Sequence, residues 1–349
     1  MITSILILLA LAVPAGIVYT RKNPQFGARP TPDDLERYSQ SPQWKKGVFL
    51  NQSLTTMDVG LSSMPGLLKE IMTGRKKRQP ATPLEVRKLD SKQFEDEMDK
   101  FVRYGHSTVL FRVSGKNVLI DPMFGPDASP IGPMRTRRFS KNSLEWIDDL
   151  PQLDLVLLTH DHYDHLDYDS ILKLKDKTDS FWVALGAKRH LVKWEIPEYK
   201  IKEFDWWEET EFDALRFIFT PSRHFSGRGP FDRAKSLWGG WVIQSNTRKI
   251  YWSGDGGYDS HFKEVGEKYG PFDWGFMECG QYNEKWHQIH MYPEEAVRAS
   301  QDSDVKTAIP VHWGAFSLAL HDWTEPAERF YKKASEDEIE TCYPPLGQI

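Results

Sequence analysis

The pattern of apolar and polar residues predicts a folded region from about residue 94 onward. In this region, short apolar runs that suit buried strands alternate with segments in which apolar residues recur at helical spacing. We expect strands over residues 108–113, 117–120, 155–158, 181–185, 216–219, 241–244, 249–252 and 307–311, and helices over residues 169–174, 258–269 and 293–301. The first two strands read as a hairpin through Ser114-Gly115. This alternation predicts one α/β domain with mixed sheets.

Residues 2–19 are almost wholly apolar. At about 18 residues, this segment is near the lower limit for spanning a bilayer. Arg21 and Lys22 follow it, which by the positive-inside rule leaves the remaining chain on the cytoplasmic side. A signal peptide would carry a Lys or Arg before the apolar run, and none is present, although residues 13–16 offer a candidate cleavage region. A retained anchor, a cleaved signal and a buried or disordered N-terminus all stay open.

The region between this segment and the α/β domain has a different composition, rich in Pro, Ser and Gln. Residues 60–74 carry apolar residues at helical spacing, and the basic residues 75–78 follow. A short amphipathic helix beside a basic run suits an anionic membrane surface. A helix packed on the main domain, with a solvated basic tail, is the alternative. We therefore divide the chain into an N-terminal anchor or signal (1–20), an extension (21–93) and a main domain (94–349).

The charge balance limits the partners. The net charge of −5 disfavours nucleic acid as a partner. The two cysteines, Cys279 and Cys342, rule out a disulfide framework. Nothing in the sequence determines the oligomeric state.

The chemistry concentrates in the loop after the strand expected at residues 155–158. This loop places three histidines and two carboxylates within six residues, 160–165. Imidazole and carboxylate are ligands of divalent transition metals. His160 and His162 can reach one ion, and Asp164 and His165 can reach a second ion. A solvated polar turn is the alternative, but H-x-H-x-D-H rarely follows a strand by chance.

Three later residues also follow expected strands: His224, Asp255 and His312. This is the edge at which α/β folds assemble their sites. A two-metal centre needs several ligands and usually a bridging carboxylate, and these residues complete such a set. Mostly nitrogen ligands with no thiolate favour zinc, although iron and manganese stay open.

These residues together resemble the metallo-β-lactamase superfamily. Further motifs resemble one branch of it, the N-acyl-phosphatidylethanolamine-hydrolysing phospholipase D family; they lie at residues 104–108, 121–124, 129–130, 205–209, 270–273, 290–297 and 312–316. The resemblance covers about residues 101–325. Residues 277–284 depart from the mammalian pattern, so the resemblance does not carry over an acyl-chain preference.

The resemblance implies an αββα sandwich of two mixed sheets that holds two Zn²⁺ ions. It implies that His160, His162 and His224 bind one ion, that Asp164, His165 and His312 bind the other, and that Asp255 bridges them. Asp121 and His290 match positions near the phosphate and, with Asp164, are the candidate catalytic residues. Two interpretations of His290 stay open, namely contact with the developing charge or leaving oxygen, and a structural role behind the ligands. Asp121 is expected to orient a ligand histidine.

The implied activity is zinc-dependent hydrolysis of N-acyl-phosphatidylethanolamine or related phospholipids to phosphatidic acid and N-acylethanolamine, by a dinuclear metal-bound hydroxide. The expected partners are the phospholipid substrate and a membrane surface. We expect a membrane-associated protein with a cytoplasmic catalytic domain, or an exported one if the signal is cleaved. The alternatives are a lactonase acting on sugar-phosphate or acyl-homoserine lactones, and a membrane-tethered binding protein. Any of four tryptophans near the ligand loops, Trp206, Trp207, Trp286 and Trp313, is a candidate lining for an acyl channel.

Overall fold

Two β-sheets form the centre of the structure, a computed structural model that describes residues 14, 16–58, 65–66, 69–70, 77–129 and 135–349. The first sheet contains, in spatial order, β3 (Lys100–Arg103), β4 (Val109–Val113), β5 (Lys116–Ile120), β6 (Leu153–Leu158), β7 (Thr178–Ala184) and β8 (Ile201–Phe204). The pairs from β3 to β5 are antiparallel, and those from β5 to β8 are parallel. The sheet is therefore mixed, as expected.

The second sheet is also mixed. Its spatial order is β15 (Glu340–Thr341), β14 (Val305–Val311), β13 (Phe272–Glu278), β12 (Lys249–Trp252), β11 (Gly240–Gln244), β10 (Leu215–Thr220) and β9 (Glu209–Phe212). The strands from β9 to β12 pair antiparallel, and those from β12 to β15 pair parallel. A separate short hairpin joins β1 (Trp44–Lys45) and β2 (Val48–Phe49) in the extension.

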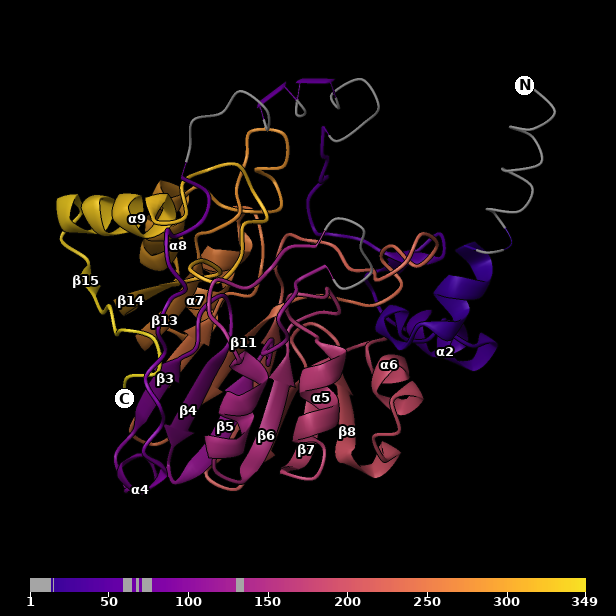
Figure 1. Cartoon of the computed structure of the whole chain (residues 1–349), viewed down its shortest axis with the longest axis horizontal. Helices are drawn as coiled ribbons and strands as arrows, with labels where there is room; N and C mark the ends of the chain where they lie inside the picture. Colours follow the sequence, from indigo (N-terminus) through magenta and orange to yellow (C-terminus); the bar gives the residue numbers. More distant parts are fainter. Residues whose placement is uncertain (1–13, 15, 59–64, 67–68, 71–76, 130–134) are drawn as a thin grey trace.

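Helices cover the outer face of each sheet (Figure 1). The helices α5 (Tyr168–Leu174), α6 (Lys188–Lys193) and η2 (Ser143–Asp149) pack on the first sheet. The helices α7 (His261–Tyr269), α8 (Pro293–Asp302) and α9 (Glu325–Glu336) pack on the second. The layers are thus helix, sheet, sheet and helix, and the predicted αββα sandwich is confirmed.

The alternation of side chains along β6 shows how the layers form. Leu155 and Leu157 face the core between the two sheets, whereas Val156 and Leu158 face the helices, where Ile171 of α5 lies. All four β6 side chains are fully buried. Because successive strand residues point to opposite faces, one apolar run supplies both cores. Burial of each such side chain contributes about 2 kcal/mol.

The chain contains 13 tryptophans, and many of them pack in the core between the sheets. Trp182, Trp238, Trp241 and Trp252 are buried there. Two of the four tryptophans suggested as a channel lining are also buried core residues: Trp206 is 6% exposed and Trp313 is 3% exposed. The packing of aromatic rings between the sheets therefore explains most of this excess.

The strands expected in the main domain are present, with ends that differ from the prediction by at most three residues. The hairpin expected through Ser114-Gly115 is antiparallel, as is the pair of β11 and β12. The helix expected at residues 258–269 begins at His261. Most residues of the predicted N-terminal anchor and of the amphipathic segment 60–74 lie outside the described residues. Within the described part of the chain, no helix has both the length and the apolar character needed to cross a membrane.

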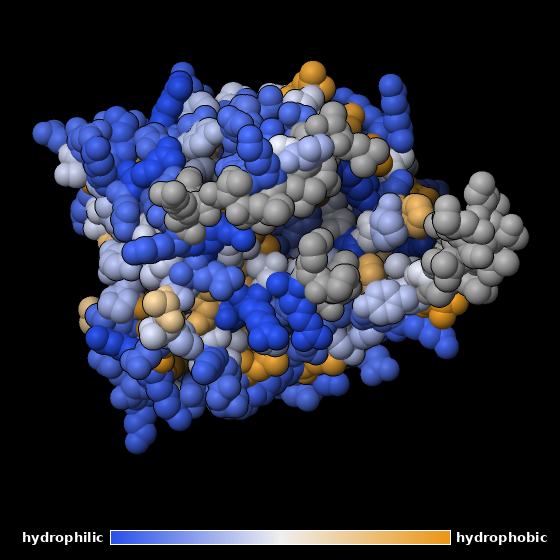
Figure 2. All heavy atoms as spheres, turned by 45° about the horizontal axis from the view of Figure 1, so that its top comes forward, coloured by the Kyte–Doolittle hydropathy of each residue, from blue (hydrophilic) through white to orange (hydrophobic). Residues whose placement is uncertain are grey.

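The extension follows the surface of the main domain. It contains η1 (Pro24–Phe26), α2 (Pro32–Tyr38) and α4 (Ser91–Phe94). Tyr38 and Phe49 enter the core between the sheets. The face seen in Figure 2 is mostly hydrophilic, with hydrophobic residues only in small groups. The division of the chain into parts stays a prediction, but the core contacts of Tyr38 and Phe49 show that the extension packs on the main domain.

Candidate metal centre

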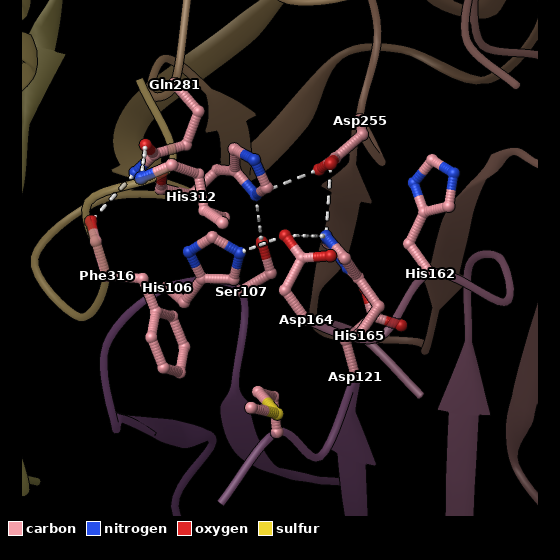
Figure 3. Close-up of polar contacts among 12 residues, drawn as sticks. His106, Ser107, Asp121, His162, Asp164, His165, Asp255, Gln281, His312 and Phe316 are labelled. Carbon is pink, nitrogen blue, oxygen red and sulfur yellow. Dashed lines mark hydrogen bonds and ion pairs between the residues drawn. The ribbon is translucent and has the colours of Figure 1, made fainter. Parts of the chain in front are cut away.

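The predicted ligands meet at one edge of the two sheets, and Figure 3 shows five of them: His162, Asp164, His165, Asp255 and His312. The loop that carries His160, His162, Asp164 and His165 follows β6, and His224 lies in the loop after β10. Asp255 lies just beyond β12, and His312 directly follows β14. Because strand ends of both sheets meet here, residues up to 152 positions apart in sequence (160 to 312) gather in one place.

His160, His162 and His224 form the first cluster. His162 Nδ1 lies 3.0 Å from His160 Nε2 and 3.2 Å from His224 Nε2. Ligand nitrogens around a tetrahedral zinc are separated by about 3.3 Å, because each Zn–N bond is about 2.0–2.1 Å. The spacing of these ring nitrogens therefore fits a shared metal ion, as predicted for this set.

Asp164, His165 and His312 form the second cluster, together with His106; their candidate ligand atoms lie within 4.8 Å of one another. His106 Nε2 is 2.8 Å from Asp164 Oδ2, and the next residue, Ser107, places its Oγ 3.1 Å from His312 Nδ1. The backbone of His106 also pairs with that of residues 312–313. One dipeptide thus contacts two of the three predicted ligands.

Asp255 adjoins both clusters. Its Oδ2 lies 3.0 Å from His165 Nε2, and its Oδ1 lies 3.1 Å from His312 Nδ1. It also groups with His160 of the first cluster. This is the position that a bridging carboxylate of a two-metal centre would need.

The charges of the site suit a cation. Burial, together with neighbouring histidines, lowers the pKa of His160, His224 and His312, which keeps their imidazoles neutral and able to bind metal. Burial raises the pKa of Asp255, but the positive charge of His165 and its hydrogen bond outweigh this effect and bring the pKa to about 2. The centre therefore combines neutral imidazoles at His160, His224 and His312 with an ionised carboxylate at Asp255. Burial opposes the charged form of His165, but the carboxylates around it outweigh this effect and raise the pKa of that imidazole.

Asp121 contacts His165, one of the predicted ligands. Its Oδ2 accepts a hydrogen bond from His165 Nδ1 at 2.8 Å, and its Oδ1 accepts one from the backbone N–H of Thr159 at 2.9 Å. His224 Nδ1 is held in a similar way by the carbonyl oxygen of Ile289 at 3.0 Å. Such partners fix the tautomer and direction of a ligand imidazole.

His290 lies at the edge of the site. Its ring centroid is 5.1 Å from those of both His224 and His312. Its Nδ1 is 3.1 Å from Oε1 of Glu278, a buried carboxylate at the end of β13. Burial raises the Glu278 pKa to about 8; burial opposes the charged form of His290, but the Glu278 carboxylate outweighs it and raises the pKa of that imidazole. Sequence reasoning missed Glu278, because nothing in the order of residues places it behind His290.

Two cavities meet at the candidate centre. One of about 300 Å³ is lined by His162, Asp164, His224, Asp255, His290 and His312, and by Trp286 of the four tryptophans considered above. A second cavity, of about 670 Å³, extends from it under residues 48–57 of the extension. Both are lined by Met57, His224, Phe225 and Ile289. The contribution of the extension was not expected from the sequence.

Comparison with known proteins shows which family the sequence matches and which solved structures share its fold. The sequence model of the β-lactamase superfamily domain matches residues 116–313. An uncharacterized protein of Mycobacterium tuberculosis is 35% identical over 88% of this chain and 84% of its own length. N-acyl-phosphatidylethanolamine-hydrolyzing phospholipase D 1 of Caenorhabditis elegans is 30% identical over 74% of this chain and 77% of its own length.

Solved structures support the same fold. The metallo-hydrolase Igni18 of the archaeon Ignicoccus hospitalis superposes with a TM-score of 0.56 at 21% identity, over 72% of this chain and 97% of its own. An isothiocyanate hydrolase from Delia radicum gut bacteria gives a TM-score of 0.55 at 20% identity, over 72% of this chain and 98% of its own. At this level of identity the likeness concerns the fold alone.

Proposed function

Because the chain belongs to the metallo-β-lactamase superfamily of metal-dependent hydrolases, we propose that it is a zinc-dependent phospholipase D. The reaction is hydrolysis of N-acyl-phosphatidylethanolamine or a related phospholipid to phosphatidic acid and N-acylethanolamine. The sequence similarity to the C. elegans phospholipase supports this substrate class.

The apolar cavity beside the candidate metal centre carries the proposal. Its volume is about 670 Å³, and its wall includes Leu50, Leu54 and Phe225. A sugar-phosphate lactone has no apolar group that would fill such a space, whereas the acyl chain of a phospholipid or of an acyl-homoserine lactone does. Between these two, the similarity to the C. elegans phospholipase favours the phospholipid. Because the cavity joins the metal pocket at Met57 and Ile289, an acyl chain bound there stays connected to a phosphate at the centre.

The residues of the centre fit two zinc ions. His160, His162 and His224 would hold one, Asp164, His165 and His312 the other, and Asp255 would join them. When bound, two zinc ions supply Lewis acidity that activates water at neutral pH and offset charge on the phosphate oxygens.

The protein groups around the metals would orient the ligand imidazoles and exclude water from the acyl chain. Asp121 keeps the imidazole of His165 in one tautomer and direction, and the hydroxyl of Thr159 contacts Nδ1 of His160 in the same way. Ser107 contacts Nδ1 of His312, the nitrogen that also lies 3.1 Å from Asp255 Oδ1. His290 lies beside the pocket, where its imidazole is within reach of a phosphate oxygen or of the leaving oxygen. The apolar walls exclude bulk water from the acyl chain.

The substrate is a membrane lipid, so the proposal includes association with a membrane surface. The apolar N-terminal segment that ends before Arg21 and Lys22 supports such an attachment, with the catalytic domain in the cytoplasm. An exported form, after cleavage of that segment, is the alternative. The proposal includes no nucleic-acid partner, because the net charge of −5 disfavours one.

Phosphatidic acid release tests the proposal directly. The zinc-loaded full chain is incubated with N-acyl-phosphatidylethanolamine in mixed micelles, and a lactone panel runs beside it. We expect phosphatidic acid from the wild type and a loss of at least about 10³-fold in His162→Ala, because one metal cluster loses a ligand. Chelation should remove the activity and zinc should restore it.

The matched control is His287→Ala. His287 is an exposed histidine three residues from His290, and it belongs to none of the candidate ligand clusters among the described residues. Its replacement should leave the rate unchanged. Lactone opening without phosphatidic acid would reject the phospholipase and support the lactonase. Absence of bound zinc, together with no hydrolysis of either class, would support a binding protein.

A further inference from the structure

Glu278 is a buried carboxylate that the proposed chemistry does not use. It is the last residue of β13 and is 1% exposed. In the parallel part of the sheet, β12 leads to Asp255, and β14 leads to His312. Glu278 is in register with Val311, the residue before His312. The sheet therefore places this third polar side chain between two strands that deliver predicted ligands.

Both carboxylate oxygens of Glu278 are committed. Oε1 lies 3.1 Å from His290 Nδ1, and Oε2 accepts the backbone N–H of Met291 at 3.0 Å. A carboxylate placed in this way holds the imidazole and the adjacent backbone at once, so the ring can neither rotate nor shift freely. The two hydrogen bonds suit a supporting group, although each oxygen keeps a second lone pair and the ligand atoms of Glu278, His290 and His312 lie within 4.8 Å of one another.

The ring that Glu278 holds is oriented toward the site. The His290 ring is stacked on that of His312, with an interplanar angle of 15°, and crosses that of His224 at 65°. His290 also lines the 300 Å³ cavity. Since Nδ1 is turned to Glu278, and no described residue forms a hydrogen bond with Nε2, the second nitrogen is free for a ligand in that cavity.

We propose that Glu278 is a positioning residue, whose hydrogen bond to Nδ1 of His290 holds the imidazole so that Nε2 meets the phosphate group of the substrate. The inference rests on the proposed function for the identity of that substrate. It assigns a role to one of the residues, 277–284, at which the sequence departs from the mammalian phospholipase pattern.

Two substitutions separate positioning from a structural role. Glu278→Gln keeps the size of the side chain, and its amide oxygen can accept the Met291 N–H while its amide N–H donates to Nδ1 of a neutral His290. Glu278→Leu keeps the approximate volume and removes both bonds, but it leaves the buried N–H of Met291 without its acceptor, so its free energy of unfolding is expected to fall, and urea unfolding checks that the variant stays folded. We expect kcat within about tenfold of wild type for the glutamine variant and about 10–100-fold lower for the leucine variant. KM should change less than threefold, and zinc content should not change.

A double-mutant cycle tests whether Glu278 acts through His290. In a His290→Ala background, Glu278→Leu should cause no further loss of kcat, because the group that it positions is absent. An additional loss in that background, or loss of zinc from the leucine variant, would reject the proposal. So would a leucine variant with wild-type kcat.

A measurement that does not depend on substrate turnover tests this inference independently of the proposed function. Imidazole ¹⁵N NMR of the zinc-loaded chain should show one ordered state for His290 in the wild type and the glutamine variant, and a mobile ring in the leucine variant. If no phospholipid is hydrolysed, the proposed function fails while this measurement still decides the role of Glu278. A ring that stays equally ordered in the leucine variant would overturn it.

Discussion

His190 Nε2 of α6 lies 3.1 Å from Asp161 Oδ2 in the candidate metal loop, and the same ring also contacts the extension. Asp161 is the residue between His160 and His162. On its other side, His190 Nδ1 accepts the backbone N–H of Ala28 at 3.0 Å. Burial, with the charge of Arg189, lowers the pKa of His190 to about 3, so the ring is neutral and donates to Asp161 while it accepts from Ala28.

Removal of this link should weaken metal binding as well as the fold. His190→Ala leaves the half-buried N–H of Ala28 without its acceptor and removes one donor from the buried carboxylate of Asp161, which costs about 2–3 kcal/mol in the free energy of unfolding. Because Asp161 orients the loop between two ligands, we expect zinc affinity to fall about tenfold. Urea unfolding and chelator competition measure the two effects. Loss of stability with unchanged zinc affinity would show that the link supports the fold alone.

Gly27 should tolerate no side chain. A Cβ at this position would lie 1.8 Å from His190 Nδ1, and the backbone has φ +64°, which disfavours any L side chain. We expect Gly27→Ala to lower the free energy of unfolding by about 3 kcal/mol or more. Gly115→Ala is the matched control, because its φ is +77° and nothing lies within 4 Å of its Cβ. It should cost only about 1 kcal/mol, and equal losses would show that backbone strain, not the contact with His190, dominates.

Asp121→Asn should lower metal affinity without unfolding the chain. The carboxylate accepts from His165 Nδ1 and from Thr159, and an amide would turn a donor toward one of these groups. We expect zinc affinity to fall about 10–100-fold. The control is Asp167→Asn, since Asp167 accepts the Ser170 N–H as the N-cap of α5, where asparagine caps equally well. Equal affinity in both variants would contradict the orienting role.

The stability of the protein should depend on His261 in mildly acidic solution. This histidine is 2% exposed, and burial lowers its pKa from 6.5 to about 4. The unfolded chain therefore binds the proton more strongly, so stability is kept above about pH 6.5 and falls as the pH drops from 6.5 toward 4. For His261→Leu we expect the loss of unfolding free energy between pH 7 and pH 5 to be smaller than in the wild type by roughly 2 kcal/mol.

Urea titrations of both proteins at the two pH values measure this difference. The comparison between proteins cancels the pH effects of the metal centre, which the substitution does not touch. Parallel losses in both proteins would show that His261 takes no part in the acid sensitivity.

The sequence by itself predicted eight strands of the two sheets, the fold class and the candidate ligand set, but it did not predict β3, β8, β9, β13 or β15. Local order is sufficient there: the apolar run of β6 leads directly into His160, His162, Asp164 and His165, and the spacing of these residues fixes what they can bind. His224, Asp255 and His312 were found for the same reason, because each follows an apolar strand.

The tertiary structure alone decided the contacts that cross from one element to another. Glu278 lies 12 residues from His290, and Ala28 lies 162 residues from His190, and no periodicity links these pairs. The wall that residues 48–57 give to the apolar cavity depends equally on where the extension packs. Periodicity predicts which face of a strand is buried, and motif spacing predicts which side chains share a loop. The meeting of separate strands and of the extension at one sheet edge depends on packing free energy summed over the whole chain.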